Sequence, residues 1–252
     1  AVRCVRSDAS DASEVRRLMH ALSGGDWRLG GVFHAAGVLA DALLAGQSAQ
    51  RFCTVYGPKV HGAVALHRAA ALAPVSTFLV YSSVASLLGS AGQAPHSAAN
   101  SWLDAFACWR RSTCGVGQGL QWGAVAEIGY AARHGADARA ERSGMGAITR
   151  AMAYEALSCA LSPHWRLAAV LPISWPRLLG ASGAGVVPTL LTPHRHRGRA
   201  AVRVEKGEAT ALRTGAAAAV SLETVLALAA RTAGGAVDAD APLLEAGLDS
   251  LG

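Results

Sequence analysis

Residues 77–100 read TFLVYSSVASLLGSAGQAPHSAAN, and this stretch decides the fold. It opens with an apolar run of strand length, 77–81, which ends at Ser82-Ser83. A loop with two glycines follows, and the pattern then becomes helical over roughly 96–111. A continuous apolar strand that leads through a loop into a helix is typical of a parallel sheet with both faces covered.

The sequence on either side continues this alternation of strands and helices. The expected strands are 2–6, 120–122 and 166–173, and 31–38 is expected to be a buried strand that runs into a glycine turn. The expected helices are 11–22 and 58–73. Asp11 and Glu14 predict a capping box at the start of the first helix. Repeated βαβ units predict an α/β fold, with a Rossmann-like parallel sheet and helices on both faces. Ligands of such sheets bind beyond the carboxyl ends of the strands.

Composition narrows the class of protein. Hydrophobic residues make up 52% of the 252 residues and charged residues 16%, which is enough apolar surface to bury a core. No apolar run approaches the roughly 18 residues needed to cross a bilayer, so no membrane partner is expected. The five cysteines include no CxxC pair, which predicts reduced thiols, no metal site and a cytoplasmic location.

The formal net charge of +6 raises the question of nucleic acid. Part of it comes from one basic run, HRHRGR at 194–199. This run has neither interleaved aromatic residues nor the spacing of a recognition motif, so no nucleic-acid partner is expected. A solvated loop and a docking patch for an acidic neighbouring domain both remain open.

Several polar residues near the predicted strand ends could carry chemistry. Reduction of a carbonyl by a nicotinamide requires an acid, a group that holds the carbonyl oxygen, and a cation that lowers the pKa of the acid. Lys59, Ser83, His96 and Asn100 could supply these groups. Because four residues make about one helical turn, His96 and Asn100 would share a helix face. Each residue taken alone is more often structural; their combination points to catalysis.

These motifs resemble the ketoreductase domain of modular polyketide synthases, a branch of the short-chain dehydrogenase/reductases. The similar segments are HAAGVLADALL (34–44), PKVHGAVALH (58–67), VYSSVASLLGSAGQAPHSAAN (80–100) and LQWGAVAEIG (120–129). The resemblance covers nearly all of residues 1–178. It implies that Lys59, Ser83 and Asn100 are catalytic and that His96 occupies the position of the family's proton-donating tyrosine. It also implies NADP as cofactor, with cofactor-binding residues Asp8, Ala35, Ala36 and Gly37.

Two departures from the family bear on activity. The imidazole of His96 is shorter than a phenol, and a nearby Lys59 would disfavour its protonated form. Neither Tyr81 nor Tyr56 is placed to replace the lost phenol. In addition, the family's glycine-rich phosphate loop is missing, since Gly115-x-Gly117-x-Gly119 has the wrong spacing and precedes a strand. The chain is therefore expected to begin inside the domain and to bind nucleotide poorly alone.

The end of the chain resembles a second family. DADAPLLEAGLDSL (238–251) is similar to the attachment region of acyl carrier domains, which implies 4'-phosphopantetheine on Ser250. A helix N-terminus there would favour the phosphate diester, although an Asp-Ser helix cap is the simpler interpretation of the same residues. The expected domains are a partial ketoreductase (1–180), a linker (181–218) and the first part of an all-α carrier domain (219–252).

Three functions remain open from the sequence. In the first, the chain is a segment of a polyketide synthase that reduces a carrier-bound β-ketoacyl thioester with NADPH, with other synthase domains as partners. In the second, the domain has no reductase activity because His96 replaces the family's tyrosine, and it serves as a scaffold that positions the carrier and neighbouring domains. The third is a free-standing short-chain dehydrogenase, against which the position of Lys59 and the carrier motif both argue.

Overall fold

The computed structural model describes residues 2–23, 29–71, 75–126, 144–162, 165–180 and 189–194. The chain divides into two compact units, each described by itself: residues 1–123 with 148–170, and residues 124–147 with 171–252. Within the described ranges, no helix has both the length and the apolar character needed to cross a membrane.

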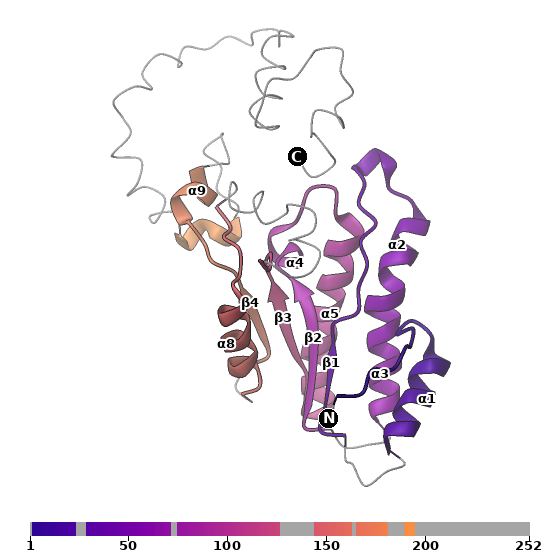
Figure 1. The fold of residues 1–252 in the computed structure, drawn as a ribbon. Helices are drawn as coiled ribbons and strands as arrows, with labels where there is room; N and C mark the ends of the chain where they lie inside the picture. Colours follow the sequence, from indigo (N-terminus) through magenta and orange to yellow (C-terminus); the bar gives the residue numbers. More distant parts are fainter. Residues whose placement is uncertain are drawn as a thin grey trace, which may run out of the picture. The chain divides into compact units, whose positions relative to one another are not determined.

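The first unit is built on a four-stranded parallel sheet (Figure 1). Its strands are β1 (Gly31–His34), β2 (Thr77–Ser83), β3 (Gln118–Trp122) and β4 (Leu167–Val170), and they lie in chain order. The register pairs His34 with Val80, and Ser83 with Trp122. The α/β fold with a Rossmann-like parallel sheet is thereby confirmed, and the carboxyl ends of β1, β2 and β3 meet at one edge.

Both faces of this sheet are buried, which explains the unbroken apolar run in β2. Phe78 and Val80 pack in one core cluster with residues of α3 (Gly62–Ala70) and α5 (Ala94–Cys114). Leu79, between them, packs on the opposite face with α8 (Arg150–Ala160). Figure 1 shows α8 on one side of the sheet, with α3 and α5 on the other.

Helix α1 (Ala12–Ser23) begins with the predicted cap. Asp11 Oδ1 accepts hydrogen bonds from the backbone N–H groups of Ser13 and Glu14, at 2.7 and 3.2 Å. The Glu14 carboxylate accepts from the N–H of Asp8 at 2.8 Å, where a capping box would have it accept from Asp11. The cap therefore extends three residues further back and orders the turn that carries Asp8.

The helix predicted over 58–73 begins earlier, at Ala49. It consists of α2 (Ala49–Tyr56), a π-helical segment η2 (Gly57–His61) and α3. The side chain of Ser48 caps it by accepting from the N–H of Arg51. Pro58 lies at the start of the π segment, and the π turn accommodates this proline inside a longer helix. Residues 72 and 73 of the prediction lie outside the described residues.

Helix α5 confirms the helix predicted over 96–111 and places Pro95 in its first turn, where the missing N–H costs nothing. It ends at Gly115, whose φ of 77° is the left-handed conformation that favours glycine at this position. Three other helical segments of this unit were not predicted: η1 (Leu44–Gly46), α4 (Ala85–Leu88) and α8.

The strand predicted over 2–6 is wrong. These residues form no strand, and Val2 is 95% exposed. Alternating valine and arginine suit a half-buried strand, but a strand also requires a neighbour to accept its hydrogen bonds. No described strand pairs with this segment. The strand predicted over 166–173 is confirmed for 167–170 only.

The second unit contains α9 (Trp175–Gly180) and a 3-10 helix, η3 (Thr189–His194). Met145 and Ile173 form an isolated antiparallel bridge, and the Trp175 ring stacks on His194 with centroids 4.2 Å apart. Apart from 189–194, the predicted linker lies outside the described residues, as do the predicted carrier segment and Ser250.

Candidate functional site

Lys59 is the cation at the centre of the candidate site. It lies in the π segment, is only 7% exposed and points toward the carboxyl end of β2. Its Nζ donates to Asn100 Oδ1 at 2.9 Å and to the backbone oxygen of Tyr81 at 3.3 Å. Burial lowers the pKa of Lys59 to about 8, and the negative charge of Asp104 opposes this effect. Lys59 is therefore mostly protonated at pH 7.

Asn100 joins Lys59 to the start of α5. Its side chain is fully buried, and its Nδ2 donates to the backbone oxygen of His96 at 2.8 Å. Its own backbone oxygen accepts from Ser82 Oγ at 3.3 Å, which links the helix to β2. The predicted spacing of His96 and Asn100 on one helix face is confirmed. Any shift of Asn100 would therefore break hydrogen bonds to both η2 and β2.

His96 lies in the first turn of α5 and is partly buried. Its pKa is lowered to about 4, first by burial and second by the charge of Lys59. The sequence predicted this effect of Lys59. Among the described residues, none forms a hydrogen bond with its buried Nδ1. At pH 7 the ring is neutral, with roughly one molecule in a thousand protonated.

Ser83 is the last residue of β2, next to this hydrogen-bonded chain. Its Oγ accepts from the N–H of Ala85 at 3.2 Å, and its backbone oxygen accepts from Ser86 Oγ at 2.7 Å. Lys59 contacts Tyr81, and Asn100 contacts Ser82, so both reach the strand within two residues of Ser83. The structure thus brings Lys59, Ser83, His96 and Asn100 to one strand end.

The residues expected to bind the cofactor flank Lys59. Ala35, Ala36 and Gly37 follow β1, and a side chain at Gly37 would place its Cβ 3.0 Å from Lys59 Cε. Because Gly37 has no side chain, the Lys59 side chain can lie against this part of the backbone. This combination of small residues, a cation and hydroxyl groups fits the ribose and nicotinamide end of a dinucleotide.

Asp8 lies in the exposed turn before α1. Its Oδ1 accepts from the N–H and the Oγ of Ser10, both at 2.8 Å, and these bonds lower the pKa of Asp8. The turn also lies against the π segment, since a side chain at Gly57 would come within 3.6 Å of Ser10 Cβ. The carboxylate is therefore ordered and charged at neutral pH.

The sequence analysis missed four polar residues around the site: His34, Ser86, Asp104 and Gln121. His34 is buried, and its Nε2 lies 2.9 Å from the backbone oxygen of Lys59. Burial is the main cause of its lowered pKa. A signal for His34 was present, because it opens the HAAG motif; the other three are isolated polar residues in sequence.

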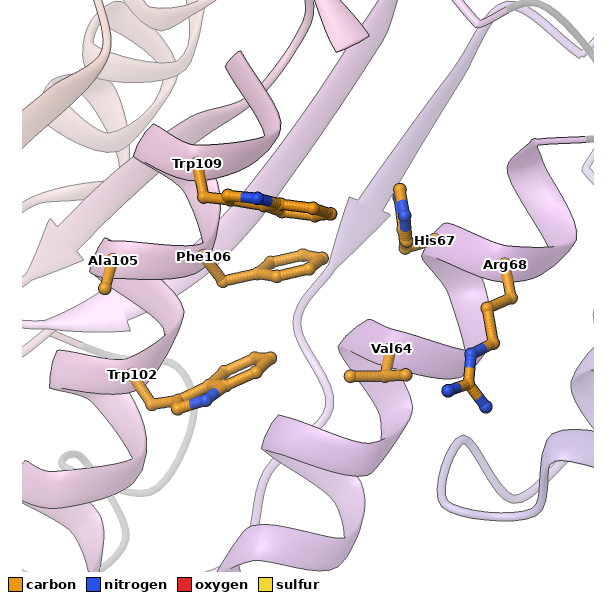
Figure 2. Close-up of a pocket in the computed structure, with 7 residues that line it drawn as sticks. All are labelled: Val64, His67, Arg68, Trp102, Ala105, Phe106 and Trp109. Atoms are coloured by element: carbon orange, nitrogen blue, oxygen red, sulfur yellow. The ribbon is translucent and has the colours of Figure 1, made fainter. Parts of the chain in front are cut away.

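A separate surface groove of about 520 Å³ lies between α3 and α5. Figure 2 shows the rings of Trp102, Phe106 and Trp109 one above the other along α5, facing Val64 and His67 of α3. Trp102 and Phe106 follow Asn100 and Asp104 by two residues, which is about 200° of helix rotation, and therefore lie on the opposite side of the helix.

Comparison with known proteins finds similarity along the whole described chain. The model of the KR domain family matches residues 1–127. Phthioceranic/hydroxyphthioceranic acid synthase of Mycobacterium tuberculosis is 37% identical over 235 residues, which cover 88% of this chain and 10% of that protein. The polyketide synthase Pks1 of the same organism, named as inactive, is 32% identical over 268 residues. The match covers 99% of this chain and 17% of that protein.

Solved structures agree with this result. A-type ketoreductases from a modular polyketide synthase superpose with a TM-score of 0.70 at 29% identity, covering 78% of this chain and 41% of theirs. The first ketoreductase of the tylosin synthase superposes with a TM-score of 0.66 at 31% identity. This match covers 76% of this chain and 42% of that ketoreductase. The chain thus spans a tenth of the length of the synthase first compared and about two fifths of these ketoreductases.

Proposed function

The chain belongs to the KR domain family, the ketoreductases of polyketide synthases, and from this premise we propose that its site serves the NADPH-dependent reduction of a β-ketoacyl thioester to a β-hydroxyacyl thioester. The observation that carries the proposal is the hydrogen-bonded chain from Lys59 through Asn100 to His96, beside Ser83. This chain of contacts brings a cation, a hydroxyl group and a proton donor to the carboxyl end of one strand, where ligands of parallel sheets bind.

Each residue then has a role in the reduction. Ser83 Oγ donates a hydrogen bond to the keto oxygen, and His96 delivers the proton that this oxygen takes up. Lys59 binds the ribose and stabilises the negative charge that develops on the oxygen, while Asn100 holds Lys59 in place. NADPH, when bound, supplies the hydride that the keto carbon receives. Ala35, Ala36 and Gly37 would lie against its nicotinamide end, and Asp8 would face its adenine.

We further propose that this reduction is slow at neutral pH. Proton transfer to the keto oxygen is efficient only from an acid whose pKa is near the working pH. The pKa of His96 is lowered to about 4, so the imidazolium is scarce at pH 7. The neutral ring retains an N–H group, but this group is a far weaker acid than either imidazolium or a phenol.

The same observation favours a second candidate, in which the domain is catalytically silent and keeps the ketoreductase shape to position its neighbours. A relative that is named as inactive, Pks1, matches almost the whole chain. In this candidate the β-keto group passes on unreduced.

The remaining organisation is also a proposal, supported by the sequence motifs. Residues 1–180 form the ketoreductase segment, 181–218 a linker and 219–252 the first part of a carrier domain. Ser250 carries 4'-phosphopantetheine, and the β-ketoacyl substrate is bound to a carrier domain. Other domains of the same synthase are the expected partners, because the relatives are long synthases of which this chain matches a small part.

The decisive experiment compares His96→Tyr with the unchanged sequence in the intact synthase that contains this chain. NADPH oxidation is followed with a β-ketoacyl thioester between pH 5 and 8. We expect little turnover by the His96 form at pH 7, a rise as the pH falls, and clear turnover by His96→Tyr at pH 7. If neither form oxidises NADPH at any pH, the reductase proposal is wrong and the silent scaffold is supported.

A further inference from the structure

Asp104 is an acidic residue buried behind the candidate site, and none of the roles above uses it. It is 8% exposed and lies one helical turn after Asn100 on the same face of α5. Its Oδ2 accepts from Ser86 Oγ at 2.6 Å and from Gln121 Nε2 at 2.8 Å. Gln121 Nε2 also lies 3.0 Å from Ser86 Oγ, so the three side chains form a closed triangle of hydrogen bonds.

The triangle joins three elements at the strand end. Ser86 belongs to α4, Asp104 to α5 and Gln121 to β3. Ser86 Oγ also lies 2.7 Å from the backbone oxygen of Ser83. A hydroxyl has one proton, which Ser86 must share between this oxygen and the Asp104 carboxylate. The position of Ser83 is therefore linked through one side chain to the buried carboxylate.

Asp104, one helical turn from the Asn100 that binds Lys59, also supplies a negative charge that acts on Lys59. Two further titratable groups that interact with Lys59 are His96 of α5 and His34 of β1, and burial lowers the pKa of both, which keeps them neutral at pH 7. Asp104 is the group whose charge raises the pKa of Lys59 against the effect of burial. Burying a carboxylate is costly, and apolar side chains of similar size would fill the same space at lower cost.

We propose that Ser86, Asp104 and Gln121 are a positioning unit for the reduction: they hold Ser83 at the end of β2, and Asp104 provides the counter-charge that keeps Lys59 protonated. This inference rests on the proposed function for the role of Ser83, but the effect on Lys59 concerns this chain alone. It assigns Asp104 an electrostatic role and Ser86 a geometric one, so the two can be tested separately.

The electrostatic role is tested by titrating Lys59 directly. Lys59 and Lys206 are the two lysines of the chain, so a ¹³C-lysine-labelled sample shows two sets of Cε signals. Their chemical shifts are followed against pH in the 252-residue chain, in Asp104→Asn and in Ser101→Ala. Ser101 is an exposed residue of α5 whose Oγ donates to the backbone oxygen of Ser97 in the turn before it, and it serves as the control.

We expect the Lys59 midpoint near pH 8 in the unchanged chain and about one pH unit lower in Asp104→Asn. Ser101→Ala and the Lys206 signal should not move. A folded Asp104→Asn chain with an unchanged Lys59 midpoint would overturn the electrostatic role. This result does not depend on turnover, so it stands apart from any failure of the proposed function.

The geometric role is tested in the intact synthase carrying His96→Tyr. Ser86→Ala should lower kcat about tenfold with KM unchanged, because Ser83 loses its fixed position but not its hydroxyl. Ser86→Thr keeps the hydroxyl and should restore kcat. Equal kcat values in all three forms, or a loss that Ser86→Thr does not restore, would overturn this role. The Ser86 variants also test the unit if Asp104→Asn fails to fold.

Discussion

The two faces of α5 carry opposite chemistry on one backbone. On one face, Asn100 and Asp104 are buried and bound through single atoms to Lys59, Ser86 and Gln121. On the other face, Trp102 and Phe106 stack at 5.0 Å and 13°, and Trp109 continues the stack (Figure 2). A hydrogen bond to a buried cation has one geometry that satisfies it, whereas ring packing depends mainly on area and volume.

This difference predicts which positions of α5 tolerate substitution. The polar face should fail when a single atom is replaced by another of the same size. The aromatic face should accept different apolar side chains with a loss that scales with the area they bury. Substitutions on each face and a change of pH test this difference in tolerance.

The largest effect is expected for Asn100→Leu. Leucine has the same number of side-chain heavy atoms in the same branched arrangement, but it removes the Oδ1 that accepts from Lys59 and the Nδ2 that donates to His96. Among the described residues, the backbone oxygen of Tyr81 would remain as the hydrogen-bond acceptor of the buried ammonium. We expect the free energy of unfolding at pH 7 to fall by about 3 kcal/mol in denaturant titrations. A loss below about 1 kcal/mol would show that the polar face is as tolerant as the aromatic one.

A change of pH tests the polar face alone. The ordinary pKa of histidine is 6.5, and that of His96 is lowered to about 4. Between these values the unfolded chain binds a proton at this position and the folded chain does not, so stability is lost as the pH falls from 6.5 toward 4. Relative to His96→Phe, the unchanged chain should lose about 2 kcal/mol of unfolding free energy between pH 7 and 4.5.

The comparison with His96→Phe isolates this residue, because His34 and His67 also have lowered pKa values and are present in both chains. Parallel pH profiles for the two chains would mean that His96 is protonated as easily in the folded state as in the unfolded one. The explanation of slow reduction would then be lost as well.

The smallest effect is expected on the aromatic face. Phe106→Leu keeps an apolar side chain in a buried position and loses its ring contacts, which should cost about 1 kcal/mol of unfolding free energy. Trp109 is 50% exposed, and Trp109→Leu should change this free energy by less than about 0.5 kcal/mol. If Trp109→Leu costs as much as Asn100→Leu, packing on this face is as specific as hydrogen bonding.

The sequence predicted β2 and α5 well because their signals are local. An unbroken apolar run marks a strand covered on both faces, and the motif that follows places His96 and Asn100 one turn apart. The failures come from effects that are not local. Residues 2–6 have the alternation of a strand but no neighbour to pair with, and Pro58 resembles a helix start because a proline inside a helix is usually excluded.

The triangle of Ser86, Asp104 and Gln121 could not be predicted from the sequence for a related reason. Taken singly, each resembles a polar residue on an exposed surface of its own helix or strand. Only the pairing of β2 with β3 and the packing of α5 on that sheet bring the three side chains together. Their burial, and therefore the cost of leaving any of them without a partner, appears only in three dimensions.

The π segment has a consequence for how this chain can change in length. Val55 and Ala63 are eight residues apart and both fully buried, although an uninterrupted α-helix would rotate them about 80° away from one another. One extra residue in the π turn takes up about 100° and brings the two positions back to within about 20°. The turn therefore corrects the phase between α2 and α3. Deleting a single residue from it would leave every amino acid chemically intact, yet either Val55 or the core face of α3 would turn toward solvent.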